Sequence, residues 1–223
     1  MLKPSNSFLA SFFIAFGIAS SAMAQWTPIT GSSGPGYGGY VRDIRNPSKY
    51  PTSTSTTTQA DTKVWMATDG GGVFTSEDNG ATWVKPAGTL SNQRVFSTAS
   101  FPSTSASAGY RLILGTMGGG VMVTGDAGAT FSQLTGLTCN YVRTLRTIST
   151  SSTTTRLLAG TDCEGTTSGI HYQDMTLGTS TWTQSTGLPS GIRVFSVAPV
   201  GATTSYNTPL MAGTSKGIYK SVD

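Results

Sequence analysis

The chain has 223 residues, of which 28 are glycine and only 11% are charged, and its formal net charge is +4. A chain so rich in glycine and poor in charge is not expected to be a helical bundle, whose exposed faces need glutamate and lysine. Its lysines and arginines are scattered, without a basic stripe that alternates with aromatic residues, so nucleic acid is not an expected partner.

The first 24 residues are predicted to be a signal peptide. Lys3 supplies the positive charge, residues 8–20 are apolar, and Ala22-Met23-Ala24 forms a cleavage site of small residues. The apolar run is short for a membrane span, and no other stretch of the sequence reads as one. We therefore expect cleavage near Ala24, no stable membrane insertion afterwards, and a secreted or periplasmic bacterial protein.

Residues 25–223 are predicted to form one domain built from a repeat of about 48 residues. Each unit contains a strand a, a loop rich in serine and threonine, a strand b of the type LxAGT, a glycine turn, a strand c, a tight turn and a strand d. Four antiparallel strands in a unit of this length are typical of a β-propeller blade. A solenoid is the rival architecture, but the four-strand meander favours an all-β propeller of about four blades.

The predicted units follow one another along the chain. They are a strand d at 25–31, blade 1 at 40–86, blade 2 at 94–135, blade 3 at 141–187, and an incomplete blade 4 at 192–223. Three arrangements are consistent with such ends. The chain is a truncated piece of a longer propeller, it closes into a ring with Trp26 beside the strand that ends at Asp223, or it self-associates into a larger ring.

A motif occupies the tight turn between strands c and d. It is complete as SEDNGATW at 76–83, recurs as TGDAGATF at 124–131, and has a weaker third copy ending at 182. Its aspartate can accept hydrogen bonds from the turn backbone, and its glycine permits the positive φ that the turn needs. The residues expected to build these turns are Ser76, Asp78, Gly80, Thr82, Trp83, Asp126, Gly128, Thr130, Phe131, Asp174 and Trp182.

This motif resembles the Asp-box, or BNR, repeat of sialidases, sortilin-type receptors, photosystem II assembly factors and family 74 glycoside hydrolases. In those families the box is a structural hairpin on the face away from the active site. The resemblance therefore implies folding roles for Asp78, Asp126 and Asp174.

The segment WTPITGSSGPGYGGYVRDIRNP, followed by VWMATDGGGVF, resembles the opening blade of family 74 xyloglucanases. The resemblance places Asp69 at one of the two catalytic carboxylates of that family. Ala67 stands where the family has arginine, and the second propeller that supplies the other carboxylate has no counterpart in this sequence.

The b–c and d–a loops of a propeller emerge on one face, where this sequence places tyrosines, arginines and carboxylates. These groups suit a site for a sugar or an anion, although arginines near the axis could instead pair with neighbouring blades. A sialidase is not favoured, because the arginine-containing N-terminal motif of that family is absent. The candidate ligand-binding residues are Tyr37, Tyr40, Arg94, Tyr141, Arg143, Asp162, Glu164 and Arg193.

The sequence is consistent with two functions. The first is a non-catalytic module that binds a polysaccharide or a protein through this face, and the second is a glycoside hydrolase resembling family 74 endo-β-glucanases. No cofactor or metal is expected, because the single histidine, His171, and two cysteines suit neither a zinc site nor a Ser-His-Asp triad. Cys139 and Cys163 are predicted to form a disulfide, since antiparallel pairing around Arg143 and Leu157 places them opposite each other.

Overall fold

The structure is a computed structural model that describes residues 39–47, 63–90, 92, 94–102, 109–151, 154–175, 181–200 and 209–221. The predicted signal peptide, the predicted strand at 25–31, Tyr37 and Asp223 lie outside these ranges. In the described part of the chain, no helix is both long and apolar enough to cross a membrane.

The described chain folds into four antiparallel sheets, which confirms the predicted all-β propeller class. Each sheet is a meander, so strands that follow one another in sequence are also neighbours in the sheet. Blade 1 has only three strands, and its fourth is reduced to a bridge between Thr75 and Val84. The strands are β1 (Gly39–Arg45), β2 (Val64–Gly70) and β3 (Gly72–Ser76) in blade 1; β4 (Val95–Pro102), β5 (Tyr110–Thr116), β6 (Val121–Thr124) and β7 (Ser132–Leu134) in blade 2; β8 (Val142–Ser149), β9 (Thr155–Thr161), β10 (Ile170–Asp174) and β11 (Thr183–Gln184) in blade 3; and β12 (Val194–Pro199), β13 (Leu210–Thr214) and β14 (Gly217–Lys220) in blade 4.

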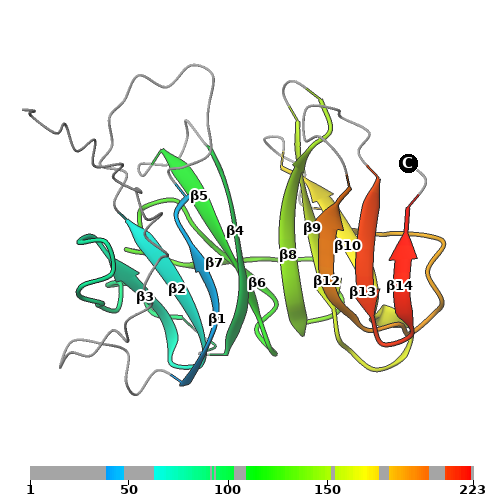
Figure 1. Cartoon of the computed structure of the whole chain (residues 1–223), viewed down its shortest axis with the longest axis horizontal. Helices are drawn as coiled ribbons and strands as arrows, with labels where there is room; N and C mark the ends of the chain where they lie inside the picture. The colour runs from blue at the N-terminus through cyan, green and yellow to red at the C-terminus, as the bar shows by residue number, and fades with distance from the viewer. Residues whose placement is uncertain are drawn as a thin grey trace, which may run out of the picture.

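The first strands of the four blades lie next to one another. Figure 1 shows β1, β4, β8 and β12 in this order across the molecule. Neighbouring pairs among them, β1 with β4, β4 with β8 and β8 with β12, are in contact. This is the arrangement of a propeller, in which the first strand of each blade lines the axis and later strands lie further out.

The core lies between the blades. Leu112 and Leu114 of β5 pack toward blade 1, whereas Ile113 between them packs toward blade 3. A strand buried on both faces needs consecutive apolar residues, which explains why this one does not alternate with polar residues. Burying each such side chain stabilises the fold by about 1.5–3 kcal/mol.

The glycine of the LxAGT strands permits close approach of the next blade. A β-carbon on Gly115 would lie 2.8 Å from Val142 Cγ1, and one on Gly160 would lie 2.8 Å from Val194 Cγ1. Both distances are shorter than van der Waals contact. The glycine therefore sets the spacing between blades 2 and 3 and between blades 3 and 4.

The disulfide between Cys139 and Cys163 is confirmed, with Cα atoms 5.8 Å apart. The predicted register was wrong by about two residues, since Thr144 pairs with Gly160 and Leu145 with Ala159. A β-bulge in β8 accounts for part of this shift. The disulfide joins the segment that enters blade 3 to the loop between β9 and β10.

The turns at 76–83 and 124–131 have the same hydrogen-bond network. Asp78 Oδ1 accepts from the Thr82 N–H at 2.8 Å, and its Oδ2 accepts from Thr82 Oγ1 at 2.5 Å. Ser76 Oγ accepts from the Gly80 N–H and donates to Asp78. These bonds lower the pKa of the Asp78 carboxyl to about 2, with the Thr82 hydroxyl as the largest cause.

In the second turn, Asp126 makes the equivalent bonds with Thr124 and Thr130. Its pKa is also lowered to about 2, again chiefly by the threonine hydroxyl. Gly80 and Gly128 both have positive φ, as does the residue before each, Asn79 and Ala127. The two turns thus share one local structure, and the Asp-box identity of that structure stays a prediction.

Asp174 differs from these two aspartates. It is the last residue of β10 and accepts two hydrogen bonds from Arg156, at 2.7 and 3.0 Å. The strand ladders show which residues are equivalent, because Ser76 pairs with Val64, Thr124 with Leu112 and Gln173 with Leu157. Gln173 is therefore the blade 3 equivalent of Ser76. Asp174 lies one residue after that position, whereas Asp78 lies two residues after it. The alignment of Asp174 with Asp78 was wrong by one residue, because the longer β9–β10 loop changes the residue count.

Candidate functional site

Each first strand carries a β-bulge at the same place. The register shifts between Val41 and Asp43, and the other three strands have the equivalent shift. A bulge leaves one residue out of the ladder and re-aims its side chain. The four bulged residues alternate between arginine and phenylalanine, and they are Arg42, Phe96, Arg143 and Phe195.

These side chains stack on one another across the blades. The guanidinium carbon of Arg42 lies 4.5 Å from the ring centre of Phe96, and that of Arg143 lies 5.0 Å from the same ring. Arg143 is also 5.9 Å from the ring centre of Phe195. Such distances permit cation–π attraction, so the four bulges are coupled across the axis-lining strands.

A second set of residues lies two positions before each bulge and extends this arrangement. The guanidinium of Arg94 lies 5.7 Å from the Phe96 ring, and that of Arg193 lies 5.9 Å from the Phe195 ring. Tyr40 stacks with Arg42 at 5.7 Å. We refer to the complete set as the arginine–aromatic row, and its members are Tyr40, Arg42, Arg94, Phe96, Tyr141, Arg143, Arg193 and Phe195.

Two aspartates anchor the arginines of the row. Asp69, at the end of β2, accepts hydrogen bonds from Arg42 Nη2 and Arg94 Nε, both at 2.7 Å. Asp162, directly after β9, accepts from Arg143 Nε at 2.7 Å and faces Arg193 Nε at 3.5 Å. The aspartate side chains are only 12% and 6% exposed.

The arginines keep Asp69 ionised. The hydrogen bond from Arg94, assisted by Arg42, outweighs the effect of burial and lowers the pKa of the Asp69 carboxyl. Asp69 therefore carries a full negative charge at neutral pH, and it cannot act there as a proton donor.

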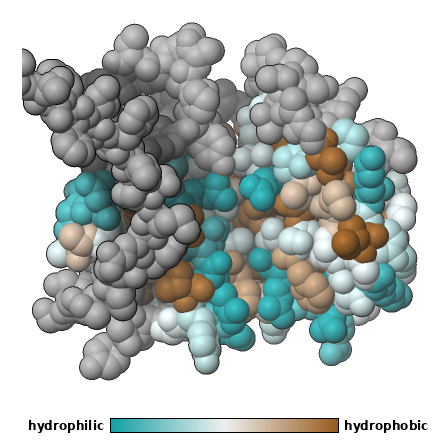
Figure 2. All heavy atoms as spheres, viewed as in Figure 1, coloured by the Kyte–Doolittle hydropathy of each residue, from teal (hydrophilic) through white to brown (hydrophobic). Residues whose placement is uncertain are grey.

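The side chains of the row are more exposed to solvent than the two aspartates that bind its arginines. Tyr40 is 77% exposed, and the side chains of Arg94 and Arg193 are 54% and 56% exposed. In Figure 2, the apolar residues not hidden by grey atoms form separate brown patches among hydrophilic ones. A ligand on the row would thus meet aromatic faces and charged groups in alternation.

The structure brings together most of the residues that the sequence predicted for this face. Contacts link Tyr40, Arg94, Arg143 and Arg193 through the stacking and the two aspartates, Asp69 and Asp162. Tyr141 lies at the equivalent position before β8, and its carbonyl accepts from the Asp162 N–H at 2.9 Å. Glu164 is exposed in the loop after β9, and among the described residues no hydrogen bond or ion pair joins its side chain to the row.

Sequence reasoning missed Arg42, Phe96 and Phe195. The signal was present, because the repeated strand reads Tyr-Val-Arg in blades 1 and 3 and Arg-Val-Phe in blades 2 and 4. The alternative that arginines pair with neighbouring blades is also correct in part. Arg94 of blade 2 binds Asp69 of blade 1, and Arg193 of blade 4 faces Asp162 of blade 3.

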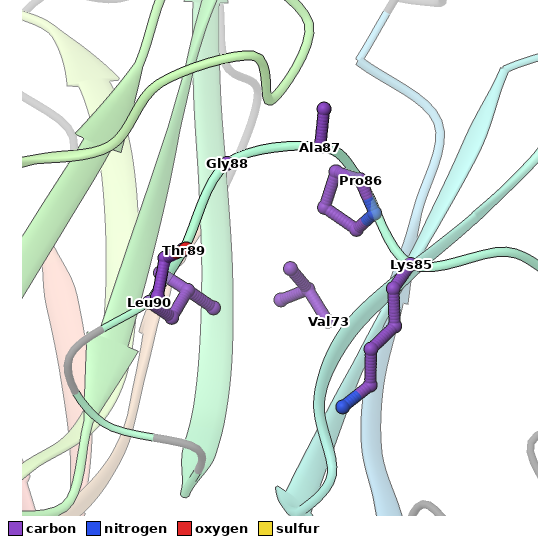
Figure 3. Close-up of a pocket in the computed structure, with 7 residues that line it drawn as sticks. All are labelled: Val73, Lys85, Pro86, Ala87, Gly88, Thr89 and Leu90. Carbon is purple, nitrogen blue, oxygen red and sulfur yellow. The ribbon is translucent and has the colours of Figure 1, made fainter.

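A separate pocket of about 260 Å³ lies along the segment after blade 1 (Figure 3). Val73, Pro86 and Leu90 form much of its wall, and Lys85 is the one charged residue that lines it. Thr89 adds a second polar side chain, and two polar side chains on one segment do not make the convergent set of a specific ligand site.

Neither a metal centre nor a histidine site is present in the described residues. No three or more histidine, cysteine, aspartate or glutamate side chains gather there to hold a metal ion. His171 is buried, which lowers its pKa, and its Nε2 lies 3.0 Å from the Thr167 carbonyl oxygen. His171 is therefore neutral at physiological pH and part of the interior.

No protein-family model and no curated protein matches this sequence. Among solved structures, an ancestral GH74 enzyme is similar, with 24% identity and a TM-score of 0.54, over 90% of this chain and 24% of that chain. A GH74 enzyme from Niastella koreensis is 16% identical over 68% of this chain and 23% of its own, with a TM-score of 0.49. YCF48 from Cyanidioschyzon merolae is 14% identical over 73% of this chain and 53% of its own, with a TM-score of 0.43.

The likeness to the ancestral enzyme concerns the fold alone and supports a β-propeller. This chain spans about a quarter of the length of that enzyme. Whether it shares a substrate or an activity with such enzymes depends on its own site residues.

Proposed function

We propose that this chain is a secreted, non-catalytic propeller module that binds a polysaccharide through the arginine–aromatic row. The observation that carries this proposal is the alternation of guanidinium and aromatic side chains at four equivalent, solvent-accessible bulges. Aromatic faces pack against the C–H faces of sugar rings, and guanidinium N–H groups donate to sugar oxygens. The predicted signal peptide and the disulfide support an exported protein.

Binding is favoured over hydrolysis by the state of Asp69. Glycoside hydrolysis usually requires one carboxyl that donates a proton and a second carboxylate. Asp69 is held ionised by two arginines, so it suits neither proton donation nor unobstructed attack on a sugar. Its role in this proposal is to orient Arg42 and Arg94.

The alternative function is hydrolysis of a β-glucan, with Asp69 as general base. The likeness of this chain to a GH74 enzyme in fold is the observation in its favour. It predicts release of reducing sugar by the wild type and its loss in Asp69→Ala.

Isothermal titration calorimetry with a panel of neutral and acidic polysaccharides tests the proposal, with reducing-sugar release measured in parallel. We expect binding without hydrolysis, and Tyr141→Ala should weaken it roughly tenfold, since an aromatic contact contributes about 0.5–1.5 kcal/mol beyond the area that it buries. Val84→Ala removes an exposed apolar residue from the outer edge of blade 1 and should leave binding unchanged. Failure to bind any polysaccharide, or hydrolysis that depends on Asp69, would overturn the proposal.

A further inference from the structure

The arginine–aromatic row is made of a two-blade unit that occurs twice. Tyr-Val-Arg begins at residues 40 and 141, and Arg-Val-Phe begins at residues 94 and 193. The residue after the threonine of strand b also alternates, because this position holds an aspartate in blades 1 and 3 and another residue in blades 2 and 4; in blade order the residues are Asp69, Met117, Asp162 and Ser215. Blades 1 and 2 therefore form one unit, and blades 3 and 4 form a second.

Each unit contains one cluster of a carboxylate and two arginines. Asp69 binds Arg42 from its own blade and Arg94 from the next blade. In the second unit, Asp162 binds Arg143 from its own blade and lies 3.5 Å from Arg193 of the next blade. Two guanidinium charges and one carboxylate leave each cluster with an excess of one positive charge.

Among the described residues, three arginines of the row use only one edge of the guanidinium. Arg94, Arg143 and Arg193 face their aspartates through Nε. Among the described residues, no hydrogen bond is observed to the Nη atoms of these three side chains. A guanidinium presents five N–H donors in a planar fork that matches a carboxylate, so the unused edge suits a carboxylate oxygen pair.

We propose that the two clusters are equivalent subsites for the carboxylate groups of an acidic polysaccharide built from uronic acid units, and that one polymer chain occupies both. This inference rests on the proposed function and specifies its ligand class. Phe96 and Arg143 form a stack that joins the two clusters, so one polymer chain can run along this stack from one cluster to the other. Occupation of the second subsite is then intramolecular, which strengthens binding of a polymer over that of a single sugar.

Neutral polysaccharides do not account for the excess of arginine. Hydroxyl groups are recognised by neutral or balanced donors and acceptors, whereas a second arginine on each aspartate leaves a positive charge unbalanced. The negative charges of Asp69 and Asp162 would repel an acidic polymer if they were only neutralised or left unpaired. Two arginines beside each aspartate give each cluster a net positive charge that attracts the polymer instead.

The test measures binding of polygalacturonate and alginate by calorimetry, with carboxyl-reduced polygalacturonate as the neutral counterpart. The variants are Arg94→Gln, Arg193→Gln and the double variant, each checked by circular dichroism and thermal unfolding. We expect roughly tenfold weaker binding for each single variant, because each loses charge-assisted hydrogen bonds to the ligand carboxylate, and a larger loss for the double variant. Arg94→Lys, which keeps the charge but not the fork, should retain folding and lose part of the affinity.

Arg156→Gln is the matched control. Arg156 also forms an ion pair with an aspartate, Asp174, and stacks on an aromatic ring, Tyr172, at 4.3 Å. It lies near the start of β9, at the opposite end of that strand from Asp162. This variant should bind the acidic polymers as tightly as the wild type does.

Four results would overturn the inference. Equal loss with Arg156→Gln would indicate nonspecific charge attraction, and a double variant no weaker than the singles would indicate one subsite. If carboxyl-reduced polygalacturonate bound as tightly as the native polymer, and Tyr141→Ala still weakened that binding, the acidic ligand class would be overturned and the proposed function would stand. Failure of the wild type to bind any polysaccharide would overturn both.

Discussion

Aspartates organise both ends of the blades, but their surroundings differ. Asp78 and Asp126, in the turns after strand c, take their hydrogen bonds from residues no more than four positions away. Asp69 and Asp162, at the other end of the sheets, bind arginines from two adjacent blades.

The two ends of the blades differ in how far their hydrogen bonds reach. The turn network is local and closed, because each oxygen of the aspartate is used by the residues that shape the turn. The arginine–aromatic row joins different blades and leaves guanidinium donors facing solvent. One residue type therefore stabilises a hairpin at one end, while at the other it orients groups that a ligand can use.

The largest effect is expected where the turn meets the core. Trp83 is buried, and its indole N–H donates to the Gly80 carbonyl at 3.0 Å. Trp83→Ala should lower the free energy of unfolding by about 3–5 kcal/mol in chemical denaturation. The adjacent exposed residue provides the control, as Val84→Ala should stay within about 0.5 kcal/mol of wild type. A Trp83→Ala loss no greater than the control would show that the turn end does not support folding.

The disulfide is expected to affect both the stability of the fold and the affinity of the row. Replacing Cys139 and Cys163 by serine should cost about 3 kcal/mol in the chain-entropy account, given a sequence separation of 24. The bond also holds the segment directly after Asp162, so polysaccharide affinity should fall in the folded variant. Unchanged affinity after loss of the disulfide would show that Asp162 is positioned without it.

Acid should destabilise the fold through the aspartates of the two turns. The folded pKa of Asp78 and of Asp126 is about 2, below the ordinary value near 3.8, so this stabilisation is complete above about pH 4 and is lost as pH falls toward 2. The melting temperature should therefore fall over that window. Asp126→Ala should melt lower at pH 5 and show a shallower acid decline, whereas Glu164→Gln should follow the wild type. An Asp126→Ala curve parallel to the wild type would contradict this account of the turns.

The smallest effect concerns one backbone position. Ala127 has φ of 56°, in the left-handed region, and the equivalent residue of the first turn is Asn79 at 59°. Asparagine tolerates this conformation better than alanine does, so Ala127→Asn should stabilise the protein by up to about 1 kcal/mol. Asn79→Ala is the reciprocal test, and it should destabilise by a similar amount. Equal stability of both variants and wild type would exclude strain at this site.

Much of the fold could be predicted from the sequence because the repeat preserves the local patterns. Strands of the LxAGT type and glycine turns recur along the chain, and the aspartate turn occurs at 76–83 and again at 124–131, where local hydrogen bonds specify it. The pairing of Cys139 with Cys163 followed from the same regularity, even though the assumed register was two residues off.

The candidate site was less predictable because it depends on bulges. A bulge adds one residue to a strand and breaks the period-2 pattern, so Arg42 and Phe96 could not be assigned to a face by alternation. The position of Asp174 was misjudged for a related reason, since the longer loop before β10 changed the spacing without changing the apparent repeat. Contacts between blades, such as Arg94 with Asp69, depend on how the sheets pack and are absent from any single repeat.

The central claim is that the turn aspartates stabilise the fold and that the arginines of the row bind a polysaccharide. Its most direct test measures thermal stability and polysaccharide affinity side by side in Asp126→Ala and Arg94→Gln. We expect Asp126→Ala to lower the melting temperature and leave affinity unchanged, and Arg94→Gln to weaken binding roughly tenfold with a stability change within about 1 kcal/mol. Loss of stability without loss of affinity in Arg94→Gln would contradict the account, because the row would then serve only to join the blades.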